Sequence, residues 1–415
     1  MEQAQMEQAE GNTEIATGNW ERQQPTREDP LPSRSGTSWS DVAADHGRDP
    51  LAELFAAIDP VSHAAMTYFY GHLFAIEPSA RAIFPPAMDA QRIRFYQALR
   101  RIALSSDNDG QLTAYLEGLG RAHRKFGVQK EHFDAFHQAL AATWQRYAPE
   151  VWTGAASAAW EDLFGRAVQI MITAAERDAE QAPPWWLAEI VGHEARSADL
   201  AVLTLQPCQP VPYLPGQHVA IQTPRWPRLW RNYSIANAPN EDGTLTIHVR
   251  AVPGGLVSAT LVHHVAVGDT LLLGAAAGAM TVDLSSQRDI LCLAGGTGLA
   301  PLKAIIEAVT GAPGAARRRE IVLYYGARHE SGLYDLPDLH RLETVYPWLQ
   351  VIPVVSEEAA PDTIYGTIPC VAARATRKNR DIYVSGPDEM IARTVAELKN
   401  RGAPEELIHY DCPPF

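Results

Sequence analysis

The spacing of apolar residues changes twice along this chain of 415 residues, and one fold cannot accommodate all three patterns. From Pro50 to about Ala182, apolar residues recur at helical spacing between short breaks. From Leu187 to about Thr281 they alternate with polar residues, which is typical of strands separated by turns. From Asp289 onward, strand-like runs alternate with helical runs. The sequence therefore predicts a multidomain chain.

We expect an all-α domain over residues 47–182, followed by an antiparallel β-barrel over residues 184–284. An α/β domain built on a parallel sheet is expected over residues 285–415. Residues 1–46 consist mainly of Glu, Gln, Ser, Thr, Gly and Pro. Because such a segment cannot bury enough apolar surface to order itself, we predict a disordered tail.

Charge and cysteine content narrow the class of protein. The formal net charge of −14 argues against nucleic acid as a partner, because phosphate binding needs a basic patch. The four cysteines have no paired spacing, which favours a reducing compartment over a disulfide framework. Since no apolar run reaches eighteen residues, we expect no membrane span, and the cytoplasm is the predicted location. No obligate protein partner is evident.

A glycine-rich turn separates a buried strand from a helix in LCLAGGTGLAPLKAII, residues 291–306. Such a turn lets the backbone approach a pyrophosphate, which the N–H groups at the helix N-terminus then bind. One glycine turn is weak evidence, because tight turns often use glycine for geometry alone. Two later strands also end in small residues, in YYGAR and VSGPDEM. The candidate nucleotide-binding residues are Gly295, Gly296, Thr297, Gly298, Gly386 and Pro387.

The run RNYSIANAP, residues 231–239, places a cation, a ring and a hydroxyl within four residues. It is either an ordinary barrel strand or a site where an arginine pairs with a phosphate and a tyrosine lies on a planar ring. A second run, GGLVSATL, offers a glycine and a hydroxyl suited to the same phosphates. The candidate residues of the two runs are Arg231, Tyr233, Ser234, Gly255, Val257 and Ser258.

With these motifs together, residues 185–415 resemble the ferredoxin-reductase family of flavin reductases. RNYS, GGLVS and PGQHV resemble its flavin motifs, and GGTGLAP and SGPDEM resemble its nicotinamide-nucleotide motifs. The resemblance implies FAD, with Arg231 on its pyrophosphate, Tyr233 stacked on the isoalloxazine and Ser234 near N5. Ser385 replaces a cysteine that is frequent in the family, a tolerated change near the nicotinamide.

Three runs of the helical region resemble the globin domain of flavohaemoglobins: TYFYGHLF, RAIFPPAMDAQR and LGRAHRKFGVQKEHF. The resemblance implies haem b, with His123 as the proximal iron ligand. It also implies that Tyr70 donates a hydrogen bond to bound oxygen and that Phe84 packs on the haem face. The other histidines of the helical region are expected on solvated faces; they are His63, His72, His132 and His137.

On the distal side the globin resemblance is incomplete. The family has a glutamine early in the next helix, and an ungapped alignment places Phe95 there. Gln91 lies too early unless a gap is introduced. We therefore expect the distal pocket to depend on Tyr70 alone.

The proximal side and the C-terminus also depart from the family pattern. A proximal tyrosine is replaced by Phe133, and its glutamate partner by Ala175, with Glu176 one position later. In the family these groups orient the proximal histidine, so their loss affects turnover more than haem binding. An aromatic residue expected near the chain end is Pro413, and Phe415 is predicted to cover the flavin instead.

The resemblance implies a nitric oxide dioxygenase. NAD(P)H would reduce FAD, FAD would pass single electrons to haem, and oxygen bound under Tyr70 would convert nitric oxide to nitrate. Oxygen and nitric oxide are then the small-molecule substrates. NADH is favoured over NADPH, because Arg328 could meet a 2′-phosphate but Glu330 and Asp335 nearby are acidic.

Two alternatives stay open. In the first, the reductase is active but the globin stores or senses oxygen, as the proximal departures suggest. In the second, the helices dock a partner without haem, and the reductase serves an external electron acceptor.

Overall fold

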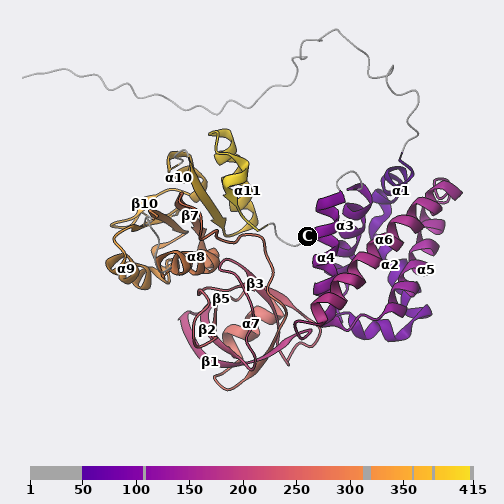
Figure 1. Cartoon of the computed structure of the whole chain (residues 1–415), viewed down its shortest axis with the longest axis horizontal. Helices are drawn as coiled ribbons and strands as arrows, with labels where there is room; N and C mark the ends of the chain where they lie inside the picture. The colour runs from indigo at the N-terminus through magenta and orange to yellow at the C-terminus, as the bar shows by residue number, and fades with distance from the viewer. Residues whose placement is uncertain (1–48, 106–108, 312–318, 358, 376–378, 412–415) are drawn as a thin grey trace, which may run out of the picture. The chain divides into compact units, whose positions relative to one another are not determined.

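The computed structural model of the chain places helices, an antiparallel sheet and an α/β sheet in the predicted order (Figure 1). It describes residues 49–105, 109–311, 319–357, 359–375 and 379–411. The tail predicted over residues 1–46 lies outside the described residues, as do Pro413 and Phe415 at the chain end. From Asp49 onward the chain forms one unit.

The first region is entirely helical. Its α-helices are α1 (Pro50–Ile58), α2 (Ser62–Ile76), α3 (Asp89–Leu104), α4 (Asp109–His123), α5 (Lys130–Tyr147) and α6 (Gly154–Ala179). Short 3₁₀ turns η1 (Asp59–Val61), η2 (Pro78–Ile83) and η3 (Arg124–Phe126) join some of them.

Local sequence explains how these helices begin and pack. Pro50 occupies the first turn of α1, and the Asp49 side chain accepts a hydrogen bond from the Leu51 N–H at 2.9 Å. Gly120 lets α4 lie directly against α6, because a Cβ there would be 2.2 Å from the Met171 carbonyl oxygen. A buried aromatic and aliphatic cluster, which includes two tryptophans of α5 and α6, fills the space between the helices.

The second region is a six-stranded antiparallel sheet in the order β4-β3-β6-β1-β2-β5. Its strands are β1 (Trp186–Ser197), β2 (Leu200–Pro207), β3 (His218–Gln222), β4 (Arg231–Ser234), β5 (Leu245–Arg250) and β6 (Thr270–Leu273). A bridge between Ile235, which follows β4, and Ile247 of β5 links the two edge strands, so the sheet curls toward a barrel. Helix α7 (Leu256–His263) packs on β5 and buries Val257 and Leu261 in the barrel core.

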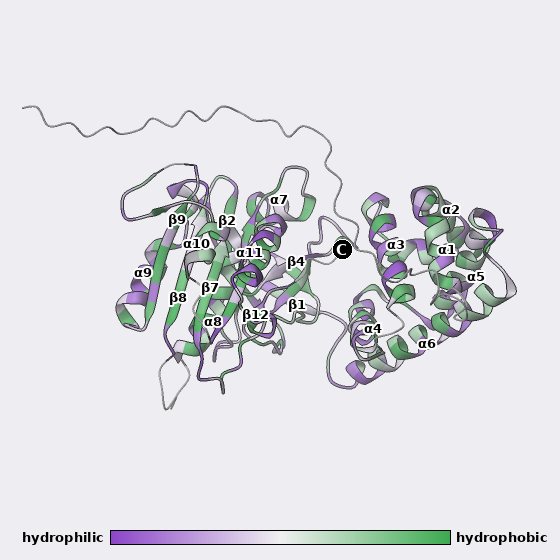
Figure 2. Ribbon diagram, turned by 90° about the horizontal axis from the view of Figure 1, so that it is seen from above, coloured by the Kyte–Doolittle hydropathy of each residue, from purple (hydrophilic) through white to green (hydrophobic). Residues whose placement is uncertain are grey.

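The third region is a parallel sheet in the order β10-β9-β8-β7-β11-β12. Figure 2 shows the apolar residues along β7, β8 and β9 that make this sheet a buried layer. Its strands are β7 (Asp289–Gly295), β8 (Ile321–Ala327), β9 (Leu349–Val355), β10 (Ile364–Tyr365), β11 (Arg380–Ser385) and β12 (Ile408–His409).

Helices cover both faces of the parallel sheet (Figure 1). Helices α8 (Leu299–Gly311) and α9 (Leu336–Val345) pack on one face, and α10 (Ile368–Ala375) and α11 (Asp388–Asn400) on the other. The short turns of this region are η4 (Gly296–Gly298), η5 (Glu330–Gly332) and η6 (Glu405–Leu407). An open sheet of this kind binds ligands at the carboxyl ends of its strands.

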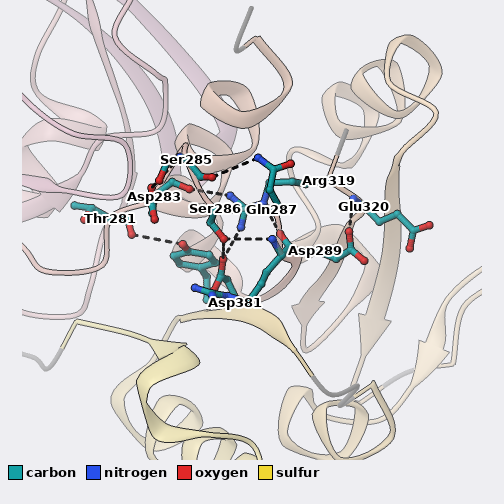
Figure 3. Close-up of polar contacts among 11 residues, drawn as sticks. Thr281, Asp283, Ser285, Ser286, Gln287, Asp289, Arg319, Glu320 and Asp381 are labelled. Carbon is teal, nitrogen blue, oxygen red and sulfur yellow. Dashed lines mark hydrogen bonds and ion pairs between the residues drawn. The ribbon is translucent and has the colours of Figure 1, made fainter. Parts of the chain in front are cut away.

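A buried ion-pair network occupies the opposite end of this sheet, where the strands begin (Figure 3). Asp381 is 2% exposed and accepts hydrogen bonds from Arg319 Nη2 at 2.6 Å and Arg288 Nε at 2.7 Å. Arg319 also donates to the Asp283 carbonyl at 3.0 Å, within the segment that joins the barrel to β7. The network therefore fixes that segment onto the sheet, away from the glycine-rich turns.

No described helix is both long and apolar enough to cross a membrane.

Candidate functional site

The proximal histidine candidate ends helix α4. The His123 side chain is half-buried, and its Nδ1 lies 2.7 Å from the Leu119 carbonyl oxygen one turn earlier. That carbonyl accepts the Nδ1 proton, which leaves Nε2 with its lone pair. Burial lowers the pKa of His123, against an opposing effect of the bond to Leu119. A neutral imidazole whose other nitrogen donates to a carbonyl fits an axial haem ligand.

Tyr70 lies on α2, 2% exposed, inside a cluster of aromatic rings. The Phe84 ring centroid lies 5.2 Å from that of Tyr70, edge-on, and the Phe95 centroid lies 5.7 Å away. Burial raises the pKa of Tyr70, so its hydroxyl stays protonated and can donate a hydrogen bond. These residues fit the distal side of a haem pocket.

The expectation that Tyr70 stands alone is wrong. Gln91, near the start of α3, places Nε2 3.5 Å from the Tyr70 hydroxyl oxygen and donates to it. The connection after Phe84 is short and α3 begins at Asp89, so Gln91 reaches the position that an ungapped alignment gives to Phe95. A gap in this loop would have revealed the amide from sequence alone.

The proximal departures persist in the structure. Phe133 packs with apolar residues of α4 and α6 such as Leu116 and Met171. The Glu176 side chain is exposed. The hydrogen bond that the structure gives to the His123 ring is therefore the one to the Leu119 carbonyl.

The expectation that the four other helical histidines lie on solvated faces is wrong for one and incomplete for two. His132 is 9% exposed, and its Nδ1 accepts the Gln129 N–H at 2.8 Å, which caps α5. His72 and His137 are half-buried against Tyr68 and Phe164. His63 is exposed, as predicted.

Strand β4 holds the candidate flavin residues. Arg231 is exposed, donates to the Trp230 carbonyl at 2.8 Å and forms no ion pair with any described carboxylate. Tyr233 and Ser234 are half-buried, and burial raises the pKa of Tyr233. An unpaired guanidinium beside a ring and a hydroxyl fits the phosphate and ring of FAD.

The second flavin run forms the start of α7. A Cβ on Gly255 would lie 2.5 Å from both Ser258 Oγ and a Val252 methyl, so this tight turn requires glycine. Ser258 is buried; it accepts the Val252 N–H at 3.3 Å and donates to the Gly255 carbonyl at 3.2 Å. Val257 points into the barrel core. These contacts brace the turn, and a phosphate would be met by backbone N–H groups.

The glycine-rich turns of the third region touch each other at the carboxyl edge of the parallel sheet. A Cβ on Gly298 would lie 2.4 Å from the Ser385 carbonyl oxygen and 2.5 Å from the Gly386 nitrogen. A Cβ on Gly295 would lie 2.5 Å from the Met390 sulfur and 3.2 Å from Pro387 Cδ. Gly296 has a φ of 55° and, with Thr297, is half-buried in the same turn. The N-termini of α8 and α11 are thus placed together, as a dinucleotide site requires.

The acidic residue that pairs with Arg328 is neither Glu330 nor Asp335, the two neighbours in sequence. Asp335 is fully buried and accepts a hydrogen bond from Lys303 Nζ at 2.7 Å, so it does not face a ligand near Arg328. Glu357 instead lies 3.6 Å from Arg328 Nε and 3.3 Å from His329 Nε2. Glu330, in η5, is exposed.

Family models match all three regions in the same order. The globin model matches residues 67–171, the oxidoreductase FAD-binding domain residues 188–281, and the oxidoreductase NAD-binding domain residues 292–396.

Similar curated proteins fall into two groups. A flavohemoprotein of Rhizobium meliloti is 27% identical over 84% of this chain and 93% of its own length. The xylene/toluene monooxygenase electron transfer component XylA of Pseudomonas putida is 32% identical over 51% of this chain and 61% of its own length. The chain thus spans nearly all of the first protein and less than two thirds of the second.

A solved structure shares the whole architecture. The flavohemoglobin from Malassezia yamatoensis covers 88% of this chain and 98% of its own, with 16% identity and a TM-score of 0.71. Globin, FAD-binding and NAD-binding domains in one chain define a haem- and flavin-dependent NAD(P)H oxidoreductase. The chain belongs to the flavohaemoglobins.

Proposed function

We propose that the chain is an NAD(P)H-dependent nitric oxide dioxygenase. One observation carries the proposal: the hydroxyl of Tyr70, buried in an apolar cluster rich in aromatic rings, accepts a hydrogen bond from the amide of Gln91. A hydroxyl buried among rings is costly unless it is hydrogen-bonded, and Tyr70, which accepts from the half-buried Gln91, still has its own hydrogen to donate to a polar ligand. Oxygen bound to haem is such a ligand, and nitric oxide is the proposed co-substrate.

Haem, when bound, would supply the iron that carries oxygen and accepts single electrons. Within the protein, His123 would provide the axial nitrogen, held neutral by burial and oriented by the Leu119 carbonyl. Phe84 would pack on the porphyrin face. Tyr70 would donate a hydrogen bond to the distal ligand, and Gln91 would hold the tyrosine hydroxyl in place.

The reductase residues have separate tasks. Arg231 would neutralise the FAD pyrophosphate, and the turn at Gly255 would present backbone N–H groups to it. The turns at Gly298 and Gly386 would receive the nicotinamide nucleotide. We propose NADH rather than NADPH, because Glu357 already pairs with Arg328, and a 2′-phosphate would be repelled by that carboxylate.

Removal of the candidate phosphate ligand should weaken FAD binding. Arg231→Ala is expected to raise the Kd for FAD about tenfold to a hundredfold, since a hydrogen bond to a charged group contributes about 1.5–3 kcal/mol. FAD fluorescence during titration of the apoprotein measures this. Arg250→Ala is the control, because that barrel arginine already pairs with Asp199. Equal FAD affinity in both variants would remove Arg231 from the site.

The role of the Tyr70 hydroxyl can be tested by a substitution that removes only its oxygen. Tyr70→Phe should speed oxygen dissociation about fivefold or more, because a lost hydrogen bond costs about 1 kcal/mol. Stopped-flow displacement of oxygen by carbon monoxide measures the rate. Tyr68→Phe, on the same helix but stacked on His72, should leave the rate unchanged. If Tyr70→Phe also leaves it unchanged, another group holds the ligand.

A second candidate function is a reductase for an external electron acceptor, with a globin that stores or senses oxygen. The similarity of residues in the reductase half to an electron transfer component of a monooxygenase favours it. So does the proximal side, where His123 bonds a carbonyl rather than a carboxylate or phenol.

Nitric oxide consumption separates the two functions. Under the proposal, the full chain with NADH and oxygen consumes nitric oxide, nitrate accumulates in equal amount, and cyanide stops the reaction. Slow, cyanide-insensitive consumption with fast reduction of cytochrome c or ferricyanide would favour the reductase alternative.

A further inference from the structure

A histidine and an aspartate from distant parts of the chain meet at the edge of the flavin barrel. His218 opens β3, and Asp411 lies two residues after the end of β12. His218 Nδ1 is 3.6 Å from Asp411 Oδ2, and the two side chains are 21% and 29% exposed. His218 is the fourth residue of the PGQHV run, whereas Asp411 lies outside the candidate flavin motifs.

The carboxylate is held firmly. Asp411 Oδ1 accepts the Ala279 N–H at 2.9 Å and the Met280 N–H at 3.1 Å. Burial alone would raise the pKa of Asp411, but the nearby His218 and the hydrogen bonds from these two amides lower it overall. Asp411 is therefore an anion. Gly278 leaves room for it, since a Cβ there would lie 2.7 Å from Asp411 Oδ2.

The imidazole has a polar neighbour on each nitrogen. Asn232 Nδ2, on β4, lies 3.2 Å from His218 Nε2. With the amide nitrogen as donor, Nε2 accepts and the ring proton sits on Nδ1, toward Asp411. Rotation of the Asn232 amide would present its oxygen to Nε2, so the same surroundings also suit a doubly protonated ring.

Strand register places this imidazole beside the proposed flavin ring. His218 is the cross-strand partner of Ser234, the residue proposed to lie near flavin N5. Directly opposite residues have Cβ atoms about 4.5–5.5 Å apart and share one face of the sheet. The His218 backbone is also fixed on its other side, by two hydrogen bonds of 2.9 Å with Ala277.

Few charges surround the pair among the described residues. Asp411 is the one carboxylate within ion-pair distance of His218. On β4, Asn232 is neutral. The Arg231 side chain lies on the opposite face of the strand, because successive side chains point to alternate faces. The loop residues Ala277, Gly278 and Ala279 carry no ionisable side chain.

We propose that His218, oriented by Asp411, is the proton-accepting group that accompanies flavin reduction in this chain. The proposal rests on FAD binding at Arg231, Tyr233 and Ser234. Asp411 is a positioning residue, because it acts through the imidazole.

The reaction balances with NADH and one solvent proton. Hydride transfer from NADH would bring two electrons and one hydrogen to bound FAD and leave NAD⁺, and His218 would take up one solvent proton on Nε2 to offset the negative charge gained. Return to oxidised FAD would release two electrons to haem and two protons to solvent, one from the transferred hydrogen and one from His218. Imidazole is suited to this exchange because its second nitrogen can either accept a proton or release it while the first stays protonated.

The pH dependence of the flavin midpoint potential tests the proposal on the full chain, by anaerobic dye-coupled titration from pH 6 to 8. One additional proton per two electrons steepens the fall of potential by about 30 mV per pH unit. The wild-type slope should exceed that of His218→Gln by up to this amount, and Asp411→Asn should lie nearer to His218→Gln. His193→Gln, which replaces a histidine of β1 that bonds the Leu261 carbonyl of α7, should match the wild type.

FAD occupancy, measured on the same samples, separates two kinds of failure. If every variant retains FAD and the slopes coincide, the proton role of His218 is overturned while the proposed function stands. If the wild-type chain binds no FAD, both are overturned. If His218→Gln alone loses FAD, the slope of Asp411→Asn decides: a wild-type slope there contradicts the proposal.

Discussion

His123→Ala removes haem from the chain while leaving the flavin reductase intact. The expected haem content falls to about a tenth of wild type or less, because the aromatic cluster around Tyr70 provides contacts but no second axial nitrogen in the described part of the chain. The variant loses only a side chain at the end of α4, so the helical fold should persist. Pyridine haemochromogen absorbance, per mole of protein, measures the content.

Two controls make this result specific. His63→Ala changes an exposed histidine of α2 and should keep full haem. His123→Gly with added imidazole should recover the Soret band, since a free imidazole can occupy the vacated position. Full haem content in His123→Ala with an unchanged ligand spectrum would refute the axial assignment.

Asp381→Ala should destabilise the α/β domain more than any surface change. The substitution leaves the guanidinium of Arg319, which is 5% exposed, without its carboxylate (Figure 3). Breaking a buried pair by removing one partner costs about 3–5 kcal/mol. Thermal unfolding followed by circular dichroism, and loss of NADH:ferricyanide activity on warming, measure the effect.

The matched control is an ion pair of the same domain on the surface. Glu389→Ala breaks the exposed pair of Glu389 with Arg393 on α11 and should cost less than about 1 kcal/mol. Asp381→Asn keeps the hydrogen-bond acceptor and should fall between the two. Equal melting temperatures for Asp381→Ala and Glu389→Ala would show that the network around Arg319 does not hold the domain together.

Much of the fold follows from the period of the apolar residues. The helical spacing before Ala182, the alternation after Leu187 and the mixed pattern after Asp289 each predict the architecture found. Elements α9 and α10 are harder to predict, because they are short and β8 and β9 nearby dominate the pattern. Tertiary packing, rather than local spacing, stabilises such short helices.

The residues of the candidate sites also divide into those that local sequence predicts and those that it does not. The glycine turns are predictable because each glycine meets a specific steric need, as at Gly298. Phe95, rather than Gln91, was assigned to the distal position. A change in loop length shifts the whole of the next helix along the sequence, and the period of its apolar residues does not reveal the shift. The pair of His218 and Asp411 was unforeseen because 193 residues separate its members, a distance over which sequence spacing carries no contact information.

The acidic neighbour of Arg328 has a similar explanation. Asp335 and Glu330 follow Arg328 closely in sequence, which suggests proximity. The chain instead turns Asp335 inward onto Lys303, and the neighbouring parallel strand β9 brings Glu357 alongside. Neighbours across a parallel sheet come from the adjacent strand, so local sequence is a poor guide to them.

The most direct test follows electrons through the full chain. Under anaerobic conditions NADH is added while flavin absorbance and the Soret band are recorded together, and then oxygen and nitric oxide are supplied. The proposed electron path predicts that the flavin bleaches first, that the Soret band then shifts to that of reduced haem, and that nitric oxide disappears as nitrate forms. A bleached flavin beside a haem that stays oxidised, with nitric oxide persisting, would contradict it.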